Sequence, residues 1–277
     1  MTRTQAIAAI ETGIALANER ADAGDLCILP GEMGISNTTS SAAIVAAFLD
    51  LSAEEVTGRG ANISDERLVH KIEIVRRALD VNRPDPHNGL DVLAKVGGFE
   101  LGCIAGLILG AAARRMLVIL DGANTTSAAL IAHALAPSCV HYLLASHSSL
   151  TEHSHPHALR HLGLTPMLRL DIRLSETAGS SIVLRMLGQM LKVWEAIDSP
   201  ACLLLPPRFA WSSSPVETEE AFYSIWASIV YTPQRLSQCP QDPSTSPFAR
   251  CADARLQVPR RLPPRPSRPR RRSHRHL

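Results

Sequence analysis

The sequence has few aromatic residues and no closely spaced pair of cysteines. Of its 277 residues, 4% are aromatic whereas 45% are hydrophobic, so alanine, leucine and isoleucine have to fill the interior. Small aliphatic side chains suit the close packing of helices on a sheet. The six cysteines are scattered without a C-x-x-C pair. This pattern argues against a zinc site or a disulfide framework and favours reduced thiols in the cytoplasm.

Long apolar runs and a signal peptide are also missing. The longest apolar stretch, residues 101–113, is shorter than the ~20 residues that a helix needs to cross a bilayer. We interpret it as a buried helix. Residues 1–19 have the pattern of a charged amphipathic helix rather than of a signal peptide. We therefore expect a cytoplasmic protein without a membrane partner.

Charge is distributed unevenly along the chain. Residues 250–277 carry ten Arg and one Asp, whereas the preceding chain has 18 basic and 25 acidic residues. Residues 242–277 are rich in Pro, Ser and Arg, so we predict a disordered basic C-terminal tail. This tail lacks interleaved aromatics or a readout element, and nucleic acid is not an expected partner. Residues 199–241 form a divergent segment with six of the eleven aromatics, which leaves 1–198 as the main domain.

The most informative stretch of the main domain is Gly31–Thr39. An apolar run at 26–29 precedes it, and a helix of small residues is predicted at 40–49. A strand, a glycine-bearing turn and a helix together present backbone N–H groups to an anion. Asn37, Thr38 and Thr39 are natural N-caps for that helix. The spacing matches neither the Walker pattern nor G-x-G-x-x-G, so a plain capped turn is the alternative.

Strand and helix patterns alternate through the main domain. The clearest strand, 116–120, is continuous and apolar, and further strands are predicted at 140–145 and 167–172. Helices are predicted at 4–22, 65–79, 90–96, 101–113, 125–135 and 180–197. This alternation predicts an α/β fold with a mostly parallel, Rossmann-like sheet flanked by helices. Ligands bind beyond the carboxyl ends of such strands, where we expect Glu32, Asp121, Ser146 and His147.

Four blocks of sequence occur together in one order. They are Gly31–Ser40, Gly58–Gly60 with Lys71–Ile72, Leu120–Gly122, and Ser146–His147 leading to 173–176. Together they resemble the nicotinate-nucleotide–dimethylbenzimidazole phosphoribosyltransferases, the family that makes the lower ligand of cobalamin. The first block nearly repeats the family's GEMGIGNTTSA, and residues 97–101 resemble its GGxE segment. The resemblance extends over residues 1–197.

The resemblance implies a pentosyl transfer that needs no cofactor. Nicotinate mononucleotide would give up nicotinate while a nitrogen of 5,6-dimethylbenzimidazole attacks C1′ of the ribose, which yields α-ribazole 5′-phosphate. Glu176 would be the general base that takes the proton of the incoming benzimidazole. The residues implied in binding the phosphoribosyl group are Glu32, Gly34, Asn37, Thr38, Gly60, Lys71, Asp121, Ser146 and His147. The resemblance also implies a homodimer.

Several of these residues have plainer interpretations when they are taken alone. Glu176 would be a first-turn acid of the helix that follows, and Lys71 would be a solvated helix lysine. The run of histidines from His147 to His161 looks like a metal cluster. No carboxylate or cysteine joins it at ligand spacing, so we expect no metal site.

The chain also departs from the family pattern. Around the implied base, the family's G-E-G-T-G-A is Ser175-Glu176-Thr177-Ala178-Gly179-Ser180 here, so a glycine is lost on each side of the carboxylate. The family's N-terminal part, which supplies much of the benzimidazole pocket, does not match any residue of this sequence. The alternative function is therefore a catalytically silent fragment that retains a turn able to bind nucleotide.

Overall fold

The computed structural model of the chain describes residues 1–197 except 61, 149–150, 171 and 173–175. All described residues lie in one compact unit. The predictions for the divergent segment 199–241 and for the basic tail 242–277 fall outside the described residues, as does Ser175 beside the implied base.

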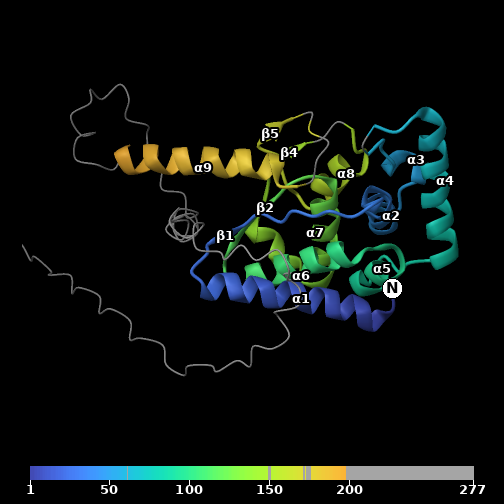
Figure 1. The fold of residues 1–277 in the computed structure, drawn as a ribbon, viewed down its shortest axis with the longest axis horizontal. Coiled ribbons are helices and arrows are strands. Elements are labelled where there is room, and N and C mark those ends of the chain that lie inside the picture. The colour runs from blue at the N-terminus through green and yellow to red at the C-terminus, as the bar shows by residue number, and fades with distance from the viewer. Residues whose placement is uncertain (61, 149–150, 171, 173–175, 198–277) are drawn as a thin grey trace, which may run out of the picture. The chain divides into compact units, whose positions relative to one another are not determined.

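The centre of the fold is a sheet of three parallel strands in the order β1-β2-β3. These strands are β1 (Cys27–Ile28), β2 (Leu117–Leu120) and β3 (Leu143–Ala145). A second parallel pair is formed by β4 (His147–Ser148) and β5 (Leu168–Arg169). Together with the helices between the strands, this arrangement confirms the predicted α/β class with parallel strands (Figure 1).

Helices make up most of the described residues. They are α1 (Arg3–Asp22), α2 (Asn37–Leu49), α3 (Ala53–Val56), α4 (Asp65–Asn82), α5 (Gly89–Val96), α6 (Phe99–Ala113), α7 (Ala123–Leu135), the 3-10 helix η1 (Pro137–Tyr142), α8 (Ser154–His161) and α9 (Ala178–Ile197). Within the described part of the chain, none of these helices is both long and apolar enough to cross a membrane.

The two faces of the central strand are covered by different helices. Val118 and Leu120 belong to the large core built by α1, α2, α5, α6 and α7. Ile119 points to the opposite face, where it packs against Val183 and Leu187 of α9. Successive side chains along a strand point to opposite faces of the sheet, so the apolar residues of β2 contribute to the hydrophobic clusters on both faces. Figure 1 shows α9 on one side of β2 and α6 with α1 on the other.

Glycine makes the contact between α1 and α6 unusually close. A Cβ added at Gly13 would lie 1.9 Å from the carbonyl oxygen of Cys103, and one added at Gly106 would lie 2.0 Å from that of Ile10. The two helices therefore pack backbone against backbone at this crossing. This contact explains why a chain with so few aromatic residues forms a dense core.

Two local predictions are corrected by the structure. The helix after the glycine-bearing turn begins at Asn37, so Asn37, Thr38 and Thr39 lie in its first turn and are not its N-cap. The N-cap is Ser36, which has φ 67° and makes no side-chain capping hydrogen bond. The strand predicted at 140–145 is shorter, because β2 offers partners only from Leu143 to Ala145 and the preceding residues form η1.

Candidate active site

The turn at Gly31–Ser36 brings three distant segments of the chain together. A Cβ added at Gly31 would lie 2.7 Å from Cγ2 of Thr177, which follows the implied base. A Cβ added at Gly34 would lie 3.0 Å from Oε1 of Glu100, at the start of α6. Close approach of a backbone to its neighbours is the reason for glycine at both positions. The predicted turn is thus packed against the segments that carry Glu100 and Glu176.

Glu32 is held by two asparagine side chains. Nδ2 of Asn124 donates to Oε1 of Glu32 at 2.6 Å and to Oδ1 of Asn37 at 2.9 Å. Nδ2 of Asn37 in turn donates to Oε2 of Glu32. Ser41 completes the network, because its hydroxyl donates to Oδ1 of Asn124 at 2.7 Å. Both oxygens of Glu32 are therefore fixed in direction.

Three carboxylates gather on this side of the turn. Burial raises the pKa of Glu32 above its ordinary value, the hydrogen bonds from the two asparagines oppose the rise, and the charges of Glu100 and Glu176 add to it. Glu176 is exposed, whereas Glu32 and Glu100 are half-buried. The result is a strongly negative region with one carboxylate open to solvent.

Lys71 approaches the same turn from α4. Its Nζ donates to Oγ1 of Thr38 at 3.0 Å and to the carbonyl oxygen of Gly58 at 2.9 Å. Gly60 has φ 55°, and a Cβ added there would lie 3.2 Å from Oγ1 of Thr38 and 3.6 Å from Nζ of Lys71. The structure therefore brings Thr38, Gly60 and Lys71 together, as the sequence predicts.

The environment of Lys71 is largely dry. Only 8% of the residue is exposed. Burial lowers the pKa of its ammonium, and the charge of Glu152 opposes this shift. Glu152 lies on the far side of Gly60, where its Oε1 accepts the Gly60 N–H at 2.5 Å.

Asp121 anchors the beginning of α9. It directly follows β2, and its Oδ1 accepts the backbone N–H of Ser180 at 2.7 Å. A carboxylate at a helix N-terminus satisfies an unpaired donor and interacts favourably with the helix dipole. Oδ2 of Asp121 is buried and has no hydrogen-bond partner among the described residues. Asp121 thus fixes the helix that begins two residues after Glu176.

Ser146 and His147 are buried next to Asp121. Ser146 Oγ is 3.3 Å from the Asp121 carbonyl oxygen and 2.9 Å from Nδ1 of His147. The two residues are 0% and 1% exposed. Burial lowers the pKa of His147, and the charge of Asp121 opposes that shift. The His147 ring packs under α9, since a Cβ added at Gly179 would lie 2.1 Å from its Nδ1.

The histidine run does not converge on a metal site. His147 and His155 pack edge to face with ring centroids 5.9 Å apart, as do His133 and His161 at 6.0 Å. Within the described ranges, no group of three or more His, Cys, Asp and Glu side chains is arranged to hold a metal ion.

Three site residues were missed in the prediction from sequence. Asn124 is the hub of the Glu32 network, Glu100 is the third carboxylate, and Glu152 holds Gly60. Asn124 follows the carboxyl end of the clearest strand, which was a usable signal. Glu100 stands in the segment 97–101 that resembles the family's GGxE, which was a second usable signal, whereas the contact of Glu152 with Gly60 becomes apparent only in the fold.

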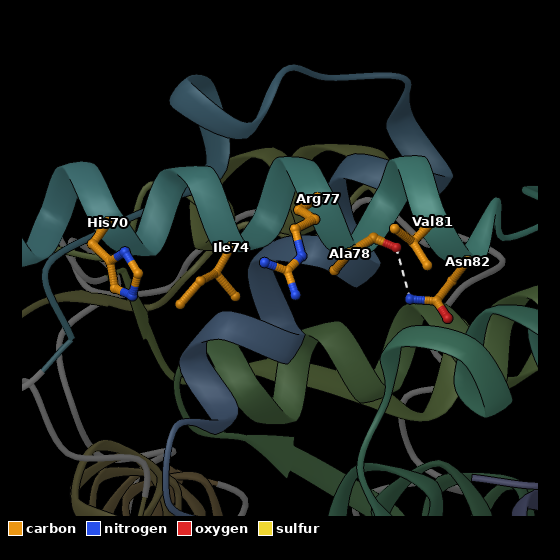
Figure 2. A pocket seen from close by; sticks show the side chains of 6 residues that line it. All are labelled: His70, Ile74, Arg77, Ala78, Val81 and Asn82. Atoms are coloured by element: carbon orange, nitrogen blue, oxygen red, sulfur yellow. Dashed lines mark hydrogen bonds between the residues drawn. The ribbon is translucent and has the colours of Figure 1, made fainter.

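A separate groove runs along α4 and does not include any predicted site residue. It has a volume of about 500 Å³ and is lined by His70, Ile74, Arg77, Ala78, Val81 and Asn82. Figure 2 shows these side chains on one stripe of the helix, with the hydrogen bond from Asn82 Nδ2 to the Ala78 carbonyl oxygen drawn as a dashed line. The groove contributes nothing to the cluster around Lys71 and Glu176.

The described site thus has two chemically different ends that meet at the first turn of α2. Thr38, Gly60 and Lys71 form an end that suits an anion, because a helix N-terminus and an ammonium group both attract negative charge. Asn37, next to Thr38, belongs to the acidic end with Glu32. Such a pair of ends suits a molecule that is anionic at one end and develops positive charge at the other.

Comparison with known proteins agrees with the family resemblance of the sequence. A family model described as Phosphoribosyltransferase (DBI_PRT) matches residues 1–200. The nicotinate-nucleotide–dimethylbenzimidazole phosphoribosyltransferase of Syntrophotalea carbinolica is 52% identical over 186 residues, which is 67% of this chain and 52% of that protein. The protein of the same name from Desulforamulus reducens is 46% identical over 193 residues, 70% of this chain and 55% of that protein.

A solved structure agrees with these relatives. The crystal structure of CobT from Thermus thermophilus superposes with a TM-score of 0.62 at 40% identity, over 65% of this chain and 53% of that one. The chain spans about half the length of the curated relatives that it matches. The motifs, the fold and the matched residues lead to one conclusion: the chain belongs to the family of nicotinate-nucleotide–dimethylbenzimidazole phosphoribosyltransferases.

Proposed function

We propose that the chain transfers the phosphoribosyl group of nicotinate mononucleotide to 5,6-dimethylbenzimidazole, in the assembly of the cobalamin nucleotide loop. The products are α-ribazole 5′-phosphate and nicotinate. One observation carries the proposal: the cationic cluster of Lys71 and Thr38 and the acidic cluster around Glu32 meet at a single helix turn. The names of the relatives support the choice of substrates.

The phosphate is assigned to the cationic end. Lys71 Nζ uses two of its three hydrogens on Thr38 and Gly58, which holds the ammonium in place with one hydrogen left for a phosphate oxygen. Thr38 lies in the first turn of α2, where the helix dipole favours an anion. A charge-assisted hydrogen bond in a dry site is stronger than one in water.

The anomeric carbon is assigned to the acidic end. The C1′–N bond to nicotinate breaks with its electron pair on the leaving pyridine nitrogen, and positive charge develops on the ribose. The carboxylates of Glu32, Glu100 and Glu176 stabilise that charge. A benzimidazole nitrogen forms the new bond to C1′, and its N–H proton passes to Glu176, which is exposed and therefore accessible.

Asp121, Ser146 and His147 are assigned to positioning. Asp121 is 1% exposed, and its Oδ1 holds the N–H of Ser180 at the start of α9. Ser146 and His147 are fully buried, and we propose that they act through Asp121 and the start of α9. Their effect on catalysis is then the placement of Glu176.

We further propose that the protein works as a homodimer in the cytoplasm. Cys27, Cys103 and Cys139 are free thiols, as a reducing compartment favours. α9 exposes an apolar stripe that a second subunit could cover, with Met186, Met190, Val193 and Trp194. Sedimentation equilibrium tests the dimer, and a monomer at all concentrations would contradict it.

The test of function is release of nicotinate. Purified protein is incubated with nicotinate mononucleotide and dimethylbenzimidazole, and nicotinate is quantified. We expect release in the parent chain, a loss of about 100-fold or more in Glu176→Gln, and normal release in Glu66→Gln, which changes an exposed first-turn acid of α4. Binding of the mononucleotide without any release would contradict transfer and support the silent fragment.

A further inference from the structure

Glu152 ties two distant segments of the chain together. Its Oε1 accepts the N–H of Gly60 at 2.5 Å, across 92 positions of sequence. Beside it, the backbone N–H of Arg59 donates to the carbonyl oxygen of Thr151 at 3.4 Å. A Cβ added at Gly58 would lie 2.3 Å from that same oxygen. The turn at 58–60 is therefore pressed against residues 151–152, with glycine where the backbones meet.

The same turn is held on its other side by Lys71. Nζ of Lys71 donates to the carbonyl oxygen of Gly58 at 2.9 Å. A Cβ added at Gly60 would lie 3.6 Å from Nζ of Lys71 and 3.9 Å from Oε1 of Glu152. Gly60 thus separates an ammonium and a carboxylate that are both more than nine-tenths buried. Each charge offsets the cost of burying the other.

A tie between two segments does not by itself require a charged side chain. Oε2 of Glu152 is buried and has no hydrogen-bond partner among the described residues. An ionised oxygen in that position destabilises the fold unless a nearby cation compensates. Burial raises the pKa of Glu152, while Lys71, the Gly60 N–H and the neighbouring His153 lower it. The carboxylate is therefore placed where its charge acts on Lys71.

We propose that Glu152 is a positioning residue for the substrate phosphate, which holds the Gly60 turn in place and keeps Lys71 charged. The inference rests on the proposed function, because it takes the cluster of Thr38, Gly60 and Lys71 as the phosphate site. A carboxylate beside a buried ammonium favours its ionised form. The cation is then ready before the substrate arrives, and no reorganisation is needed when the phosphate binds.

The charge of Lys71 depends on few neighbours. Its other contacts, the Thr38 hydroxyl on α2 and the Gly58 carbonyl, carry no charge. Among the described residues, Glu152 is the charged group that shifts the pKa of Lys71. When the Glu152 charge is removed, the lowering of the Lys71 pKa by burial is no longer opposed. The ammonium then loses its proton at a lower pH than in the parent chain.

Glu152→Gln and Glu152→Ala separate the two roles. Calorimetry measures the binding of inorganic phosphate at pH 7.5 and pH 9.5. Glu152→Gln retains an acceptor for Gly60 and loses the charge, so it binds at least as tightly as the parent at the lower pH and about tenfold more weakly at the higher pH. Glu152→Ala loses the acceptor as well and binds about tenfold more weakly at both pH values.

Glu55→Ala is the matched control. Glu55 also accepts a backbone N–H, from Ser52 at 2.9 Å, but it does so in the capping box of α3. Its removal leaves phosphate binding unchanged at both pH values. Thermal unfolding of each variant checks the fold, and Glu152→Gln carries the test alone if Glu152→Ala does not fold.

The outcomes distinguish this inference from the proposed function. Phosphate binding that is absent in the parent, or that has the same pH profile in the parent and Glu152→Gln, overturns the role of Glu152. The expected phosphate pattern without any release of nicotinate from the mononucleotide overturns the transferase function and leaves the role of Glu152 standing.

Discussion

Lys71 and Thr38 are 33 positions apart in sequence, and Nζ of one lies 3.0 Å from Oγ1 of the other. The contact joins the second turn of α4 to the first turn of α2. It changes the interpretation of both residues. A lysine with 8% of its surface exposed is not a solvated helix lysine, and Thr38 is not an N-cap. Both belong to the one cluster that we propose as the phosphate site.

Replacement of Lys71 by methionine tests that cluster. Methionine keeps the length of the side chain but leaves the buried Glu152 charge uncompensated, so we expect the free energy of unfolding to fall by about 1–3 kcal/mol, and kinetics are measured well below the unfolding temperature. The KM for nicotinate mononucleotide should rise about 10–100-fold, because a charge-assisted hydrogen bond to phosphate is lost. The KM for nicotinate riboside, which has no phosphate, should not change. Lys95→Met, on the exposed ion pair with Asp91, is the control.

Thr177 occupies a backbone conformation that its side chain disfavours. Its φ is 65°, in the left-handed region, at a position where the family pattern has glycine. A β-branched residue is strained there. Thr177→Gly should therefore raise the free energy of unfolding by about 1 kcal/mol, measured by urea denaturation. Thr12→Gly, in the middle of α1, should lower it by about as much. A loss of stability in both variants would refute strain at Thr177.

Replacement of two glycines of α9 by alanine should change stability in opposite directions. A Cβ at Gly179 would lie 2.1 Å from the fully buried ring of His147, whereas nothing lies within 4 Å of a Cβ at Gly188. Gly179→Ala should cost about 1–3 kcal/mol through overpacking. It should also slow nicotinate release, because the start of α9 places Glu176. Gly188→Ala should stabilise by about 0.5–1 kcal/mol. Equal stability of the two variants would show that His147 does not confine this helix.

His155 should make the protein sensitive to acid. Burial, with a smaller contribution from His147, lowers its pKa to about 3. An unfolded histidine titrates near pH ~6.5, so between these values the unfolded chain binds a proton that the folded chain does not. Stability is therefore complete above pH ~6.5 and falls with decreasing pH, by up to about 1.4 kcal/mol per unit.

The pH dependence is isolated by comparison with a variant. His155→Gln cannot take up the proton, so the slope of unfolding free energy against pH between 6.5 and 5 should become shallower by up to about 1.4 kcal/mol per unit. His70→Gln, on the exposed face of α4, should retain the parent slope. Identical slopes in the parent and His155→Gln would exclude a buried neutral histidine at this position.

The parts of the fold that the sequence predicts well are those encoded locally. Leu117–Leu120 is a continuous apolar run because both of its faces are covered, and residues 101–113 of α6 are apolar on all sides because most of them are buried. The strand at 140–145 is predicted too long because its length is set by the partner strand, which no local pattern reveals. The φ of Ser36 is likewise imposed by the turn that it closes.

The site is predictable where its residues follow strand ends or the glycine-bearing turn. Glu32 and Asp121 meet this condition, and the structure joins each to a network at the carboxyl side of the sheet. Glu100 and Glu152 do not meet it. Their roles depend on approaches to Gly34 and Gly60 that arise from tertiary packing, so the GGxE resemblance marks Glu100 without showing which residues it contacts.

The central claim is that one sugar phosphate extends from Lys71 to Glu176 across the first turn of α2. A crystal structure with bound nicotinate mononucleotide tests it most directly. The account predicts phosphate oxygens on Nζ of Lys71 and Oγ1 of Thr38, with C1′ facing the Glu176 carboxylate. A mononucleotide seated elsewhere, such as in the α4 groove beside Arg77, would contradict it.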